Sequence, residues 1–490
     1  MSNKNLPTHK LQAQSKAVTQ TLRHILYQVF IEGAPADRTL SRHLRSHKEY
    51  GSRDRRLITE SVFAVFRWWG WLRFVIDEKH REIPPPGMVS GKQNAGQESP
   101  LVRLNENDEP EFNISGADMA RLLLGAHILE LKKELPQPAA VWISTAGVDE
   151  NAVQMITDKI SETAQADSYS TFQLELIKEL YSVFYPESND MPIFRWENLQ
   201  TAWIVEKISN HVEPVNLIQW LQKRPPLWLR VQFADVRDVV RELKENDVQA
   251  VPHDNITNAC RLSPTRTNLY SMPLYRSGKI EIQDIASQCT GIICDAAPKE
   301  RWWDACAGAG GKTIQLAAMM ESKGTVVASD NREYKLKDLK RRARRAGIPN
   351  IDTQSWNGGK PNKKRSPFDG VLVDAPCSGS GVWRRNPEGR WIIKQEDLEE
   401  LTALQYRLLS NASQAVKSGG SLVYATCSVM REENDDIIDK FLSEHPDFTF
   451  DIFQNPLTGE KVDGLLQIWP WEADCDAMFI ARLTRVLHEK

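Results

Sequence analysis

The spacing of apolar residues predicts helices in the first third of the chain. Apolar side chains recur every three or four positions over residues 58–76, as they do on one face of a helix. The same periodicity returns over Met119–Leu129 and Phe172–Phe184. We therefore expect an all-helical domain over residues 1–190. Residues 83–115 are rich in Pro, Gly and polar side chains, which predicts a loop or linker inside it.

The first predicted helix admits two interpretations. Trp68, Trp69 and Trp71 alternate with arginines that include Arg67 and Arg73. An aromatic stripe facing the core, with arginines in solvent, is the favoured interpretation. The alternative is one edge of an RNA-contacting surface, where Arg neutralises phosphate and stacks on bases.

After residue 195 the pattern predicts strands. Two short apolar runs, Trp228–Gln232 and Val248–Pro252, flank a helical segment at Val236–Glu245, which predicts a small α+β module over residues 195–292. From 296 to 488 apolar strands alternate with helices, as in a doubly wound, Rossmann-like α/β domain with a parallel sheet. The predicted strands are Arg301–Asp304, Thr325–Asp330, Phe368–Asp374, Gly420–Thr426 and Ala477–Leu483.

Composition adds little until the cysteines are considered. The 490 residues carry 62 Lys and Arg against 65 Asp and Glu, so no global basic excess indicates a nucleic-acid partner. All seven cysteines follow residue 259 and no pair has CxxC spacing, which argues against a disulfide framework or a metal site. The polar start and the lack of a long apolar run predict neither a signal peptide nor a membrane span. We expect a cytoplasmic protein.

A glycine-rich turn joins the first predicted strand of the α/β domain to a helix. The segment runs from Asp304 to Thr313 as DACAGAGGKT. It lacks the first glycine of a P-loop, where Cys306 stands, and the third glycine of a dinucleotide fingerprint. An acidic residue, Asp330, ends the next strand, where a carboxylate can bind ribose hydroxyls. A nucleoside site is favoured over a purely structural turn.

Two cysteines follow the ends of successive strands. Cys377 lies in Asp374-Ala-Pro-Cys and Cys427 in Ala425-Thr-Cys-Ser. The carboxyl ends of parallel strands line the ligand crevice of an open sheet, so both thiols should face the same cleft as the glycine loop.

These motifs together resemble the RNA cytosine-5 methyltransferases of the Sun/RsmB type. The similarity rests on DxCAxxGGKT, DAPCSGxG and TCS followed by Glu432-Glu433-Asn434, with RPPLWLR over residues 224–230 as an upstream match. The resemblance implies S-adenosylmethionine as cofactor, RNA as substrate and no metal. It also implies that the first 190 residues are similar to a transcription antitermination factor that binds RNA. The favoured RNA is that of the small ribosomal subunit, with tRNA as the alternative.

The resemblance also implies roles for individual residues. Cys427 would add to C6 of the base and Cys377 would assist product release, while Asp374 and Lys312 would hold the polar edge of the base. Asn357 stands where many family members place an Asp. The expected cofactor-binding residues are Asp304, Ala307, Gly308, Ala309, Gly310, Gly311, Lys312, Asp330, Asn357 and Asp374.

Basic residues near this predicted cleft are candidates for RNA contact. A helix after Asp330 is strongly basic, which is typical either of a solvated face or of phosphate binding. The candidates are Arg224, Trp228, Arg230, Lys340, Arg341, Arg344, Arg384 and Arg385. Two other functions stay open on the sequence, a P-loop-like NTPase and a non-catalytic RNA-binding factor.

Overall fold

The protein is described by a computed structural model that divides into two compact units. It describes residues 6–76, 102–105, 110–131, 134–163, 169–209, 212–361 and 367–486. The first unit comprises Met1–Lys223 and Trp383–Lys394, and the second comprises Arg224–Val382 and Gln395–Lys490. The boundary after Lys223 differs from the one predicted near residue 190, because α8 and α9 group with the helices that precede them.

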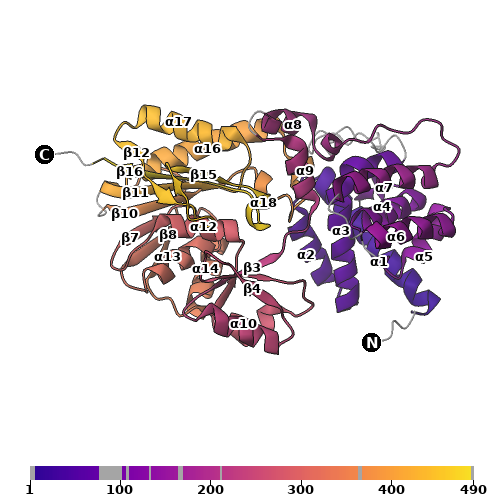
Figure 1. Ribbon diagram of the computed structural model, residues 1–490, viewed down its shortest axis with the longest axis horizontal. Coiled ribbons are helices and arrows are strands. Elements are labelled where there is room, and N and C mark those ends of the chain that lie inside the picture. Colours follow the sequence, from indigo (N-terminus) through magenta and orange to yellow (C-terminus); the bar gives the residue numbers. More distant parts are fainter. Residues whose placement is uncertain are drawn as a thin grey trace. The chain divides into compact units, whose positions relative to one another are not determined.

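The first unit is built mainly of helices (Figure 1). They are α1 (Thr8–Phe30), α2 (Ala36–Ser46), α3 (Ser52–Leu72), α4 (Gly116–Leu129), α5 (Ala139–Ala146), α6 (Glu150–Thr163), α7 (Tyr169–Phe184), α8 (Ala202–Ser209), α9 (Pro214–Gln222) and α15 (Gly389–Ile392), with the 3₁₀ turns η1 (Arg73–Val75) and η3 (Trp196–Leu199). Strands β1 (Val102–Leu104) and β2 (Pro110–Phe112) pair antiparallel within the segment predicted as a loop. The rest of that prediction, over residues 83–101 and 106–109, lies outside the described residues.

The tryptophans of α3 belong to the core of the first unit. Trp68, Trp69 and Trp71 are each at most 2% exposed, which confirms the interpretation of a core-facing stripe. The expectation that the arginines lie in solvent is wrong for Arg67, which is buried and whose Nη1 lies 2.6 Å from a carboxylate oxygen of Glu130. Because these side chains are enclosed, this face of α3 offers no surface to RNA.

A segment distant in sequence completes that core. Arg390 is fully buried and donates hydrogen bonds to the backbone carbonyls of Leu199, Leu221 and Trp383. The indole of Trp391 donates to the carbonyl of Phe66 at 2.7 Å. Residues 383–394 therefore fold with the first unit, although the predicted boundaries placed them in the α/β domain. The apolar periodicity of the sequence does not indicate that residues 383–394 pack with the first unit.

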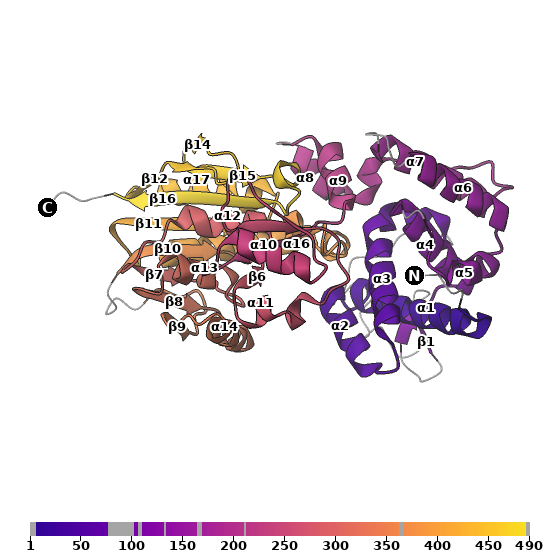
Figure 2. The same ribbon diagram turned by 60° about the horizontal axis from the view of Figure 1, so that its bottom comes forward.

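The second unit is organised around an eight-stranded sheet. Figure 2 shows strands of this sheet side by side, with helices packed against them. Its main path runs β12-β16-β11-β10-β7-β8-β9, with β15 paired to β16. Five neighbouring strands, from β11 to β9, are parallel, and the strands at the other side are antiparallel. The strands are β7 (Arg301–Asp304), β8 (Thr325–Ser329), β9 (Ile351–Gln354), β10 (Phe368–Asp374), β11 (Val416–Thr426), β12 (Phe448–Phe450), β15 (Leu465–Ile468) and β16 (Met478–Arg485).

Helices cover both faces of this sheet, as predicted for a doubly wound domain. Successive residues of β7 point to opposite faces, so Trp302 packs in one core and Trp303 in the other. The first core includes α12 (Ile285–Cys294) and α13 (Gly311–Met319), with α14 (Glu333–Arg345) beside them. The second includes α16 (Gln395–Ser413) and α17 (Asp435–Glu444).

A small antiparallel sheet precedes the large one within the second unit. Its order is β4-β5-β3-β6, from β3 (Leu227–Val231), β4 (Ala250–Pro252), β5 (Ala259–Leu262) and β6 (Ile280–Ile282). Helix α10 (Val236–Glu245) buries Val239 and Leu243 in the core of this module. These elements lie where the sequence predicts a strand–helix–strand module. Across the described ranges, no helix is both long and apolar enough to cross a membrane.

Candidate functional site

The glycine loop between β7 and α13 needs its glycines for geometric reasons. Gly308 and Gly310 have φ values of 53° and 84°, in the left-handed region that favours glycine. A Cβ on Gly310 would lie 2.4 Å from Cγ of Leu339 on α14. A Cβ on Gly308 or Gly311 would meet nothing within 4 Å. The loop is therefore packed on one side and open to a ligand on the other.

Asp304 ends β7 beneath this loop and is almost fully buried. Its Oδ2 accepts a hydrogen bond from the hydroxyl of Thr313 at 2.6 Å, while its Oδ1 is buried without a partner. Burial raises the pKa of Asp304 to about 7, although the Thr313 hydrogen bond opposes the shift. The unpartnered oxygen is the feature expected of a carboxylate that accepts from a bound ligand.

Asp330 follows β8 and binds both the glycine loop and its own neighbour. Its Oδ2 accepts from the backbone N–H of Gly308 at 3.0 Å, and Arg332 donates three further hydrogen bonds to the two oxygens. Burial raises the pKa of Asp330, but the hydrogen bonds and charge of Arg332 outweigh it and hold that pKa below its ordinary value. A ribose at this position has to share the Asp330 carboxylate with the half-exposed Arg332 side chain or displace that side chain.

Asn357 closes a turn after β9. Its Oδ1 accepts from the backbone N–H of Gly359 at 3.2 Å. The neighbouring Trp356 ring lies 4.9 Å from the Trp303 ring in an edge-to-face arrangement. The structure thus places the aromatic Trp356 against β7, whereas the sequence prediction singled out Asn357 for the cofactor.

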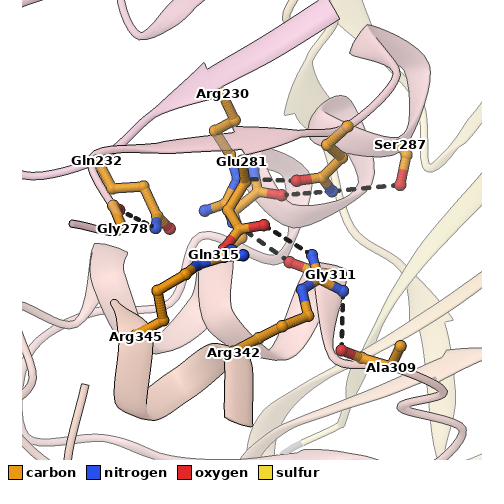
Figure 3. A network of polar contacts seen from close by, with 11 residues as sticks. Arg230, Gln232, Gly278, Glu281, Ser287, Ala309, Gly311, Gln315, Arg342 and Arg345 are labelled. Carbon is orange, nitrogen blue, oxygen red and sulfur yellow. Dashed lines mark hydrogen bonds and ion pairs between the residues drawn. The ribbon is translucent and has the colours of Figure 1, made fainter. Parts of the chain in front are cut away.

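A buried polar network holds the glycine loop from the outside (Figure 3). The carbonyl of Ala309 accepts from Arg342 at 2.8 Å, and that of Gly311 accepts from Arg230 at 3.4 Å. Glu281 on β6 binds both Arg342 and Arg345 of α14. These ion pairs join the small antiparallel sheet, the basic helix and the loop into one support.

This network corrects the expectation that Arg230 contacts RNA. Arg230 is 1% exposed and also donates to Gln283 at 2.7 Å, so its guanidinium has no surface for a phosphate. Arg384 is fully buried as well and donates to the carbonyl of Lys223 at 3.0 Å. Trp228 is 5% exposed, which leaves little surface for base stacking. Of the other candidates, Arg385 is half-buried, and Arg224, Lys340, Arg341 and Arg344 are exposed.

Lys312 and Asp374 form an ion pair at the centre of the site. The Lys312 Nζ lies 2.8 Å from Oδ2 of Asp374, and both side chains are largely buried. Burial lowers the pKa of Lys312, but the Asp374 carboxylate together with Cys427 and Asp304 raises it by more, so the net pKa lies above its ordinary value. Lys312 comes from the start of α13 and Asp374 from the end of β10, so the sheet brings together two residues that the sequence predicts as neighbours.

The two predicted cysteines lie in contact. Their Sγ atoms are 3.5 Å apart, after the carboxyl ends of the adjacent parallel strands β10 and β11. The hydrogen bond with Cys427, followed by burial, raises the pKa of the Cys377 thiol well above its ordinary value. All seven cysteines are free. A pair of thiols at this distance can share one proton, with one sulfur ionised and the other donating to it.

Glu433 is not among the site residues that the sequence predicts, although it belongs to the Glu432-Glu433-Asn434 motif. Its side chain is fully buried and accepts hydrogen bonds from Ser378 and Ser428, the residues that follow the two cysteines. An acidic residue shortly after the second cysteine was the available signal. Its function as a link between two loops could not be derived without the fold.

The site fits a cofactor with a nucleoside and an amino-acid end. The open side of Gly308 and Gly311 leaves room against the backbone, and Asp304 offers a buried oxygen without a partner. Asp330 lies at the adjacent strand end, where a ribose carboxylate is expected. Within the described part of the chain, no group of three or more His, Cys, Asp and Glu residues could hold a metal ion.

Comparison with known proteins identifies the family of the chain. The family described as 16S rRNA methyltransferase RsmB/F matches residues 292–484. A probable ribosomal RNA small subunit methyltransferase B of Bacillus subtilis (strain 168) is 31% identical over 301 residues, which cover 59% of this chain and 67% of the relative. A protein of the same printed name from Synechocystis is 26% identical, over 92% of this chain and 94% of its own. The crystal structure of PH0851 has the same fold, with a TM-score of 0.69 and 24% identity over 96% of this chain and 98% of that one.

Proposed function

Because the chain belongs to the RsmB/F family of S-adenosylmethionine-dependent RNA methyltransferases, we propose that it methylates C5 of a cytosine in small-subunit rRNA through a covalent bond to Cys427. The observation that carries the proposal is the contact between the Cys377 and Cys427 sulfurs beside the Lys312–Asp374 ion pair. A ligand-binding fold without nucleophilic chemistry would not need two thiols at adjacent strand ends.

The reaction requires a nucleophile because C5 of cytosine does not attack a methyl donor unaided. The thiolate of Cys427 adds to C6, and the electron pair of the former C5–C6 double bond moves to C5. When bound, S-adenosylmethionine supplies the electrophilic methyl group. C5, made electron-rich by the addition of Cys427, would accept that methyl group from the sulfonium sulfur, which would keep the electron pair of the broken bond. Loss of the C5 proton to a water molecule then restores the C5–C6 double bond and expels the Cys427 thiolate.

The surrounding side chains bind and orient the base. The Lys312–Asp374 pair presents a cation and a carboxylate, which match the acceptor and donor groups on the polar edge of cytosine. Cys377 carries a thiol whose raised pKa keeps it protonated, so it serves as the proton-bearing partner during product release. Asp304 and Asp330 would hold the amino group and the ribose of the cofactor.

The exposed basic residues supply the RNA-binding part of the proposal. Lys340, Arg341 and Arg344 lie on the exposed face of α14, whose other face is fixed to Glu281. Contacts of this kind neutralise phosphates and make binding salt-dependent. Ribosomal RNA is favoured because the two relatives described above are named for it. A tRNA remains the second candidate.

Two alanine variants test the roles of the cysteines. Cys427→Ala should abolish methyl transfer to RNA, because no thiolate reaches C6. Cys377→Ala should accumulate a covalent protein–RNA adduct that survives denaturing electrophoresis, because release is impaired. Cys260→Ala, which removes a thiol in the small antiparallel sheet, should do neither. An active Cys427→Ala protein, or an adduct formed by Cys427→Ala and not by Cys377→Ala, would refute these assignments.

A further inference from the structure

Glu433 lies at the meeting point of three segments of the second unit. It ends the 3₁₀ turn η6 (Arg431–Glu433). Its Oε1 accepts from the backbone N–H of Ser378 at 2.8 Å and from Gln405 at 2.9 Å. Its Oε2 accepts from the hydroxyls of Ser378, at 2.5 Å, and Ser428. Four donated hydrogen bonds therefore saturate the carboxylate.

The four donors fit a carboxylate. A backbone N–H and the Gln405 amide can only donate to Oε1, and Oε2 accepts from two hydroxyls. A carboxylate accepts at all four sites, whereas a carboxylic acid keeps the pattern only if one serine hydroxyl turns from donor to acceptor. Glu433 forms no ion pair with Lys or Arg among the residues that the structure describes. A buried charge held only by hydrogen bonds is costly to maintain, which points to a functional reason for it.

The donors tie the two cysteine loops together. Ser378 and Ser428 directly follow Cys377 and Cys427 in sequence. A third hydroxyl, that of Ser380, lies 3.1 Å from the Ser378 hydroxyl and 3.0 Å from that of Ser428. Without the carboxylate these hydroxyls would lack their common acceptor. The 3.5 Å separation of the two thiols thus depends on loops that Glu433 holds.

We propose that Glu433 is a positioning residue, which holds the two cysteine loops together and keeps a proton on Cys377, so that Cys427 acts as the nucleophile. This inference rests on the proposed function, because it explains how the pair selects its nucleophile. The negative charge disfavours a second negative charge on the adjacent Cys377 loop.

The charged groups around the pair support this distribution. Lys312 from α13 interacts with Cys427 and with Asp374, so a cation lies on the side of the nucleophile. Glu433 interacts with Cys377, and it contributes to the raised pKa of that thiol after the Cys427 hydrogen bond and burial. Tyr424 on β11 also interacts with Cys377 and is neutral, because burial raises its pKa well above its ordinary value. Both charges favour the same assignment.

Thiol labelling of the full-length protein tests the inference without cofactor or RNA. Wild-type protein treated with limiting iodoacetamide should be alkylated mainly on Cys427, as measured by peptide mass spectrometry. Glu433→Gln preserves the shape of the side chain and removes its charge. It should raise the ratio of Cys377 to Cys427 labelling about tenfold, which corresponds to about one pKa unit. Glu444→Gln, the same change on an exposed carboxylate of α17, should leave the ratio unchanged.

A second variant guards against poor folding of Glu433→Gln. Ser428→Ala removes one tie between the loops and keeps the carboxylate, so it should lower labelling of Cys427 while Cys377 stays protected. Unchanged labelling in Glu433→Gln would refute the effect of the charge, and unchanged labelling in Ser428→Ala would refute the positioning of the loops. In methyl-transfer assays Glu433→Gln should lower kcat, leave the KM for S-adenosylmethionine within about twofold, and retain more activity than Glu433→Ala. Methyl transfer by Cys427→Ala would refute the proposed function. If Cys427→Ala is inactive but Glu433→Gln is labelled like wild type, the proposed function stands and the inference about Glu433 is refuted.

Discussion

Above pH 7, the charged Asp304 carboxylate should make the folded protein less stable than an uncharged side chain at the same position would. Its pKa is about 7 in the folded protein against an ordinary value of 3.8, a difference of about three pKa units. Each unit corresponds to about 1.4 kcal/mol, so ionising this buried carboxylate costs about 4 kcal/mol of folding free energy above pH 7. Because the folded pKa is raised, folding takes up a proton between pH 4 and pH 7, and stability is lost as the pH rises through that window.

Asp304→Asn removes this titration and keeps the acceptor for the Thr313 hydroxyl. The stability of the variant relative to wild type should therefore increase by about 2 to 3 kcal/mol between pH 5 and pH 8. Urea unfolding without cofactor, followed by tryptophan fluorescence, to which the buried Trp302 and Trp303 contribute, measures the difference at each pH. Comparing the difference at two pH values cancels any constant effect of the amide on packing.

The same variant should lose the cofactor. S-adenosylmethionine should raise the melting temperature of wild type and leave that of Asp304→Asn unchanged, because the buried oxygen at Oδ1 no longer carries a charge for the cofactor amino group. A stability difference that is the same at pH 5 and pH 8 would show that Asp304 is ionised throughout and would refute the reasoning. An undiminished thermal shift in the variant would refute the assigned contact.

Two further variants test other parts of the cofactor loop. Arg332→Met frees the Asp330 carboxylate from a half-exposed partner, so it should tighten S-adenosylmethionine binding by up to about fivefold in calorimetric titration. The control Arg241→Met removes an exposed ion pair on α10 and should leave binding unchanged. Weaker binding by Arg332→Met would show that this side chain supports the cofactor. Gly310→Ala should cost about 3 kcal/mol of unfolding free energy, from the left-handed φ and the clash with Leu339, whereas Gly308→Ala should cost about 1 kcal/mol because its Cβ meets open space. Equal losses in the two glycine variants would contradict this account.

The sequence predicts the α/β part of the fold well because its signals are local. A buried parallel strand is a short apolar run bounded by polar residues, and β7, β10 and α10 have the predicted bounds. Rules for parallel sheets then place the ends of these strands at one edge, which is why Cys377, Cys427 and Asp374 could be assigned to one cleft before their distances were known. The insertion of residues 383–394 into the first unit has no such local signal, since it depends on which distant carbonyls Arg390 meets.

Arginine is the residue type for which sequence-based prediction was least reliable. Arg342 and Arg345 share α14 with Arg341 and Arg344, yet the first two bind Glu281 and the others are exposed. A basic helix therefore has a structural face and a solvent face, and composition alone does not separate them. Arg230 belongs to the structural group because β3 directs its side chain toward the glycine loop.

Glu433 shows why a cysteine pair cannot be understood from its two cysteines. The strand ends bring Cys377 and Cys427 to adjacent positions, but the loops that follow them could hold the sulfurs at many distances. Hydrogen bonds between the loops fix the separation: the Gly381 N–H donates to the Cys427 carbonyl, and the buried Glu433 carboxylate accepts from both Ser378 and Ser428. Because the same group carries a charge, it also makes the two thiols unequal. The same carboxylate therefore affects both the positions of the two loops and the location of the proton. Glu433→Gln, which removes only the charge, separates these two effects.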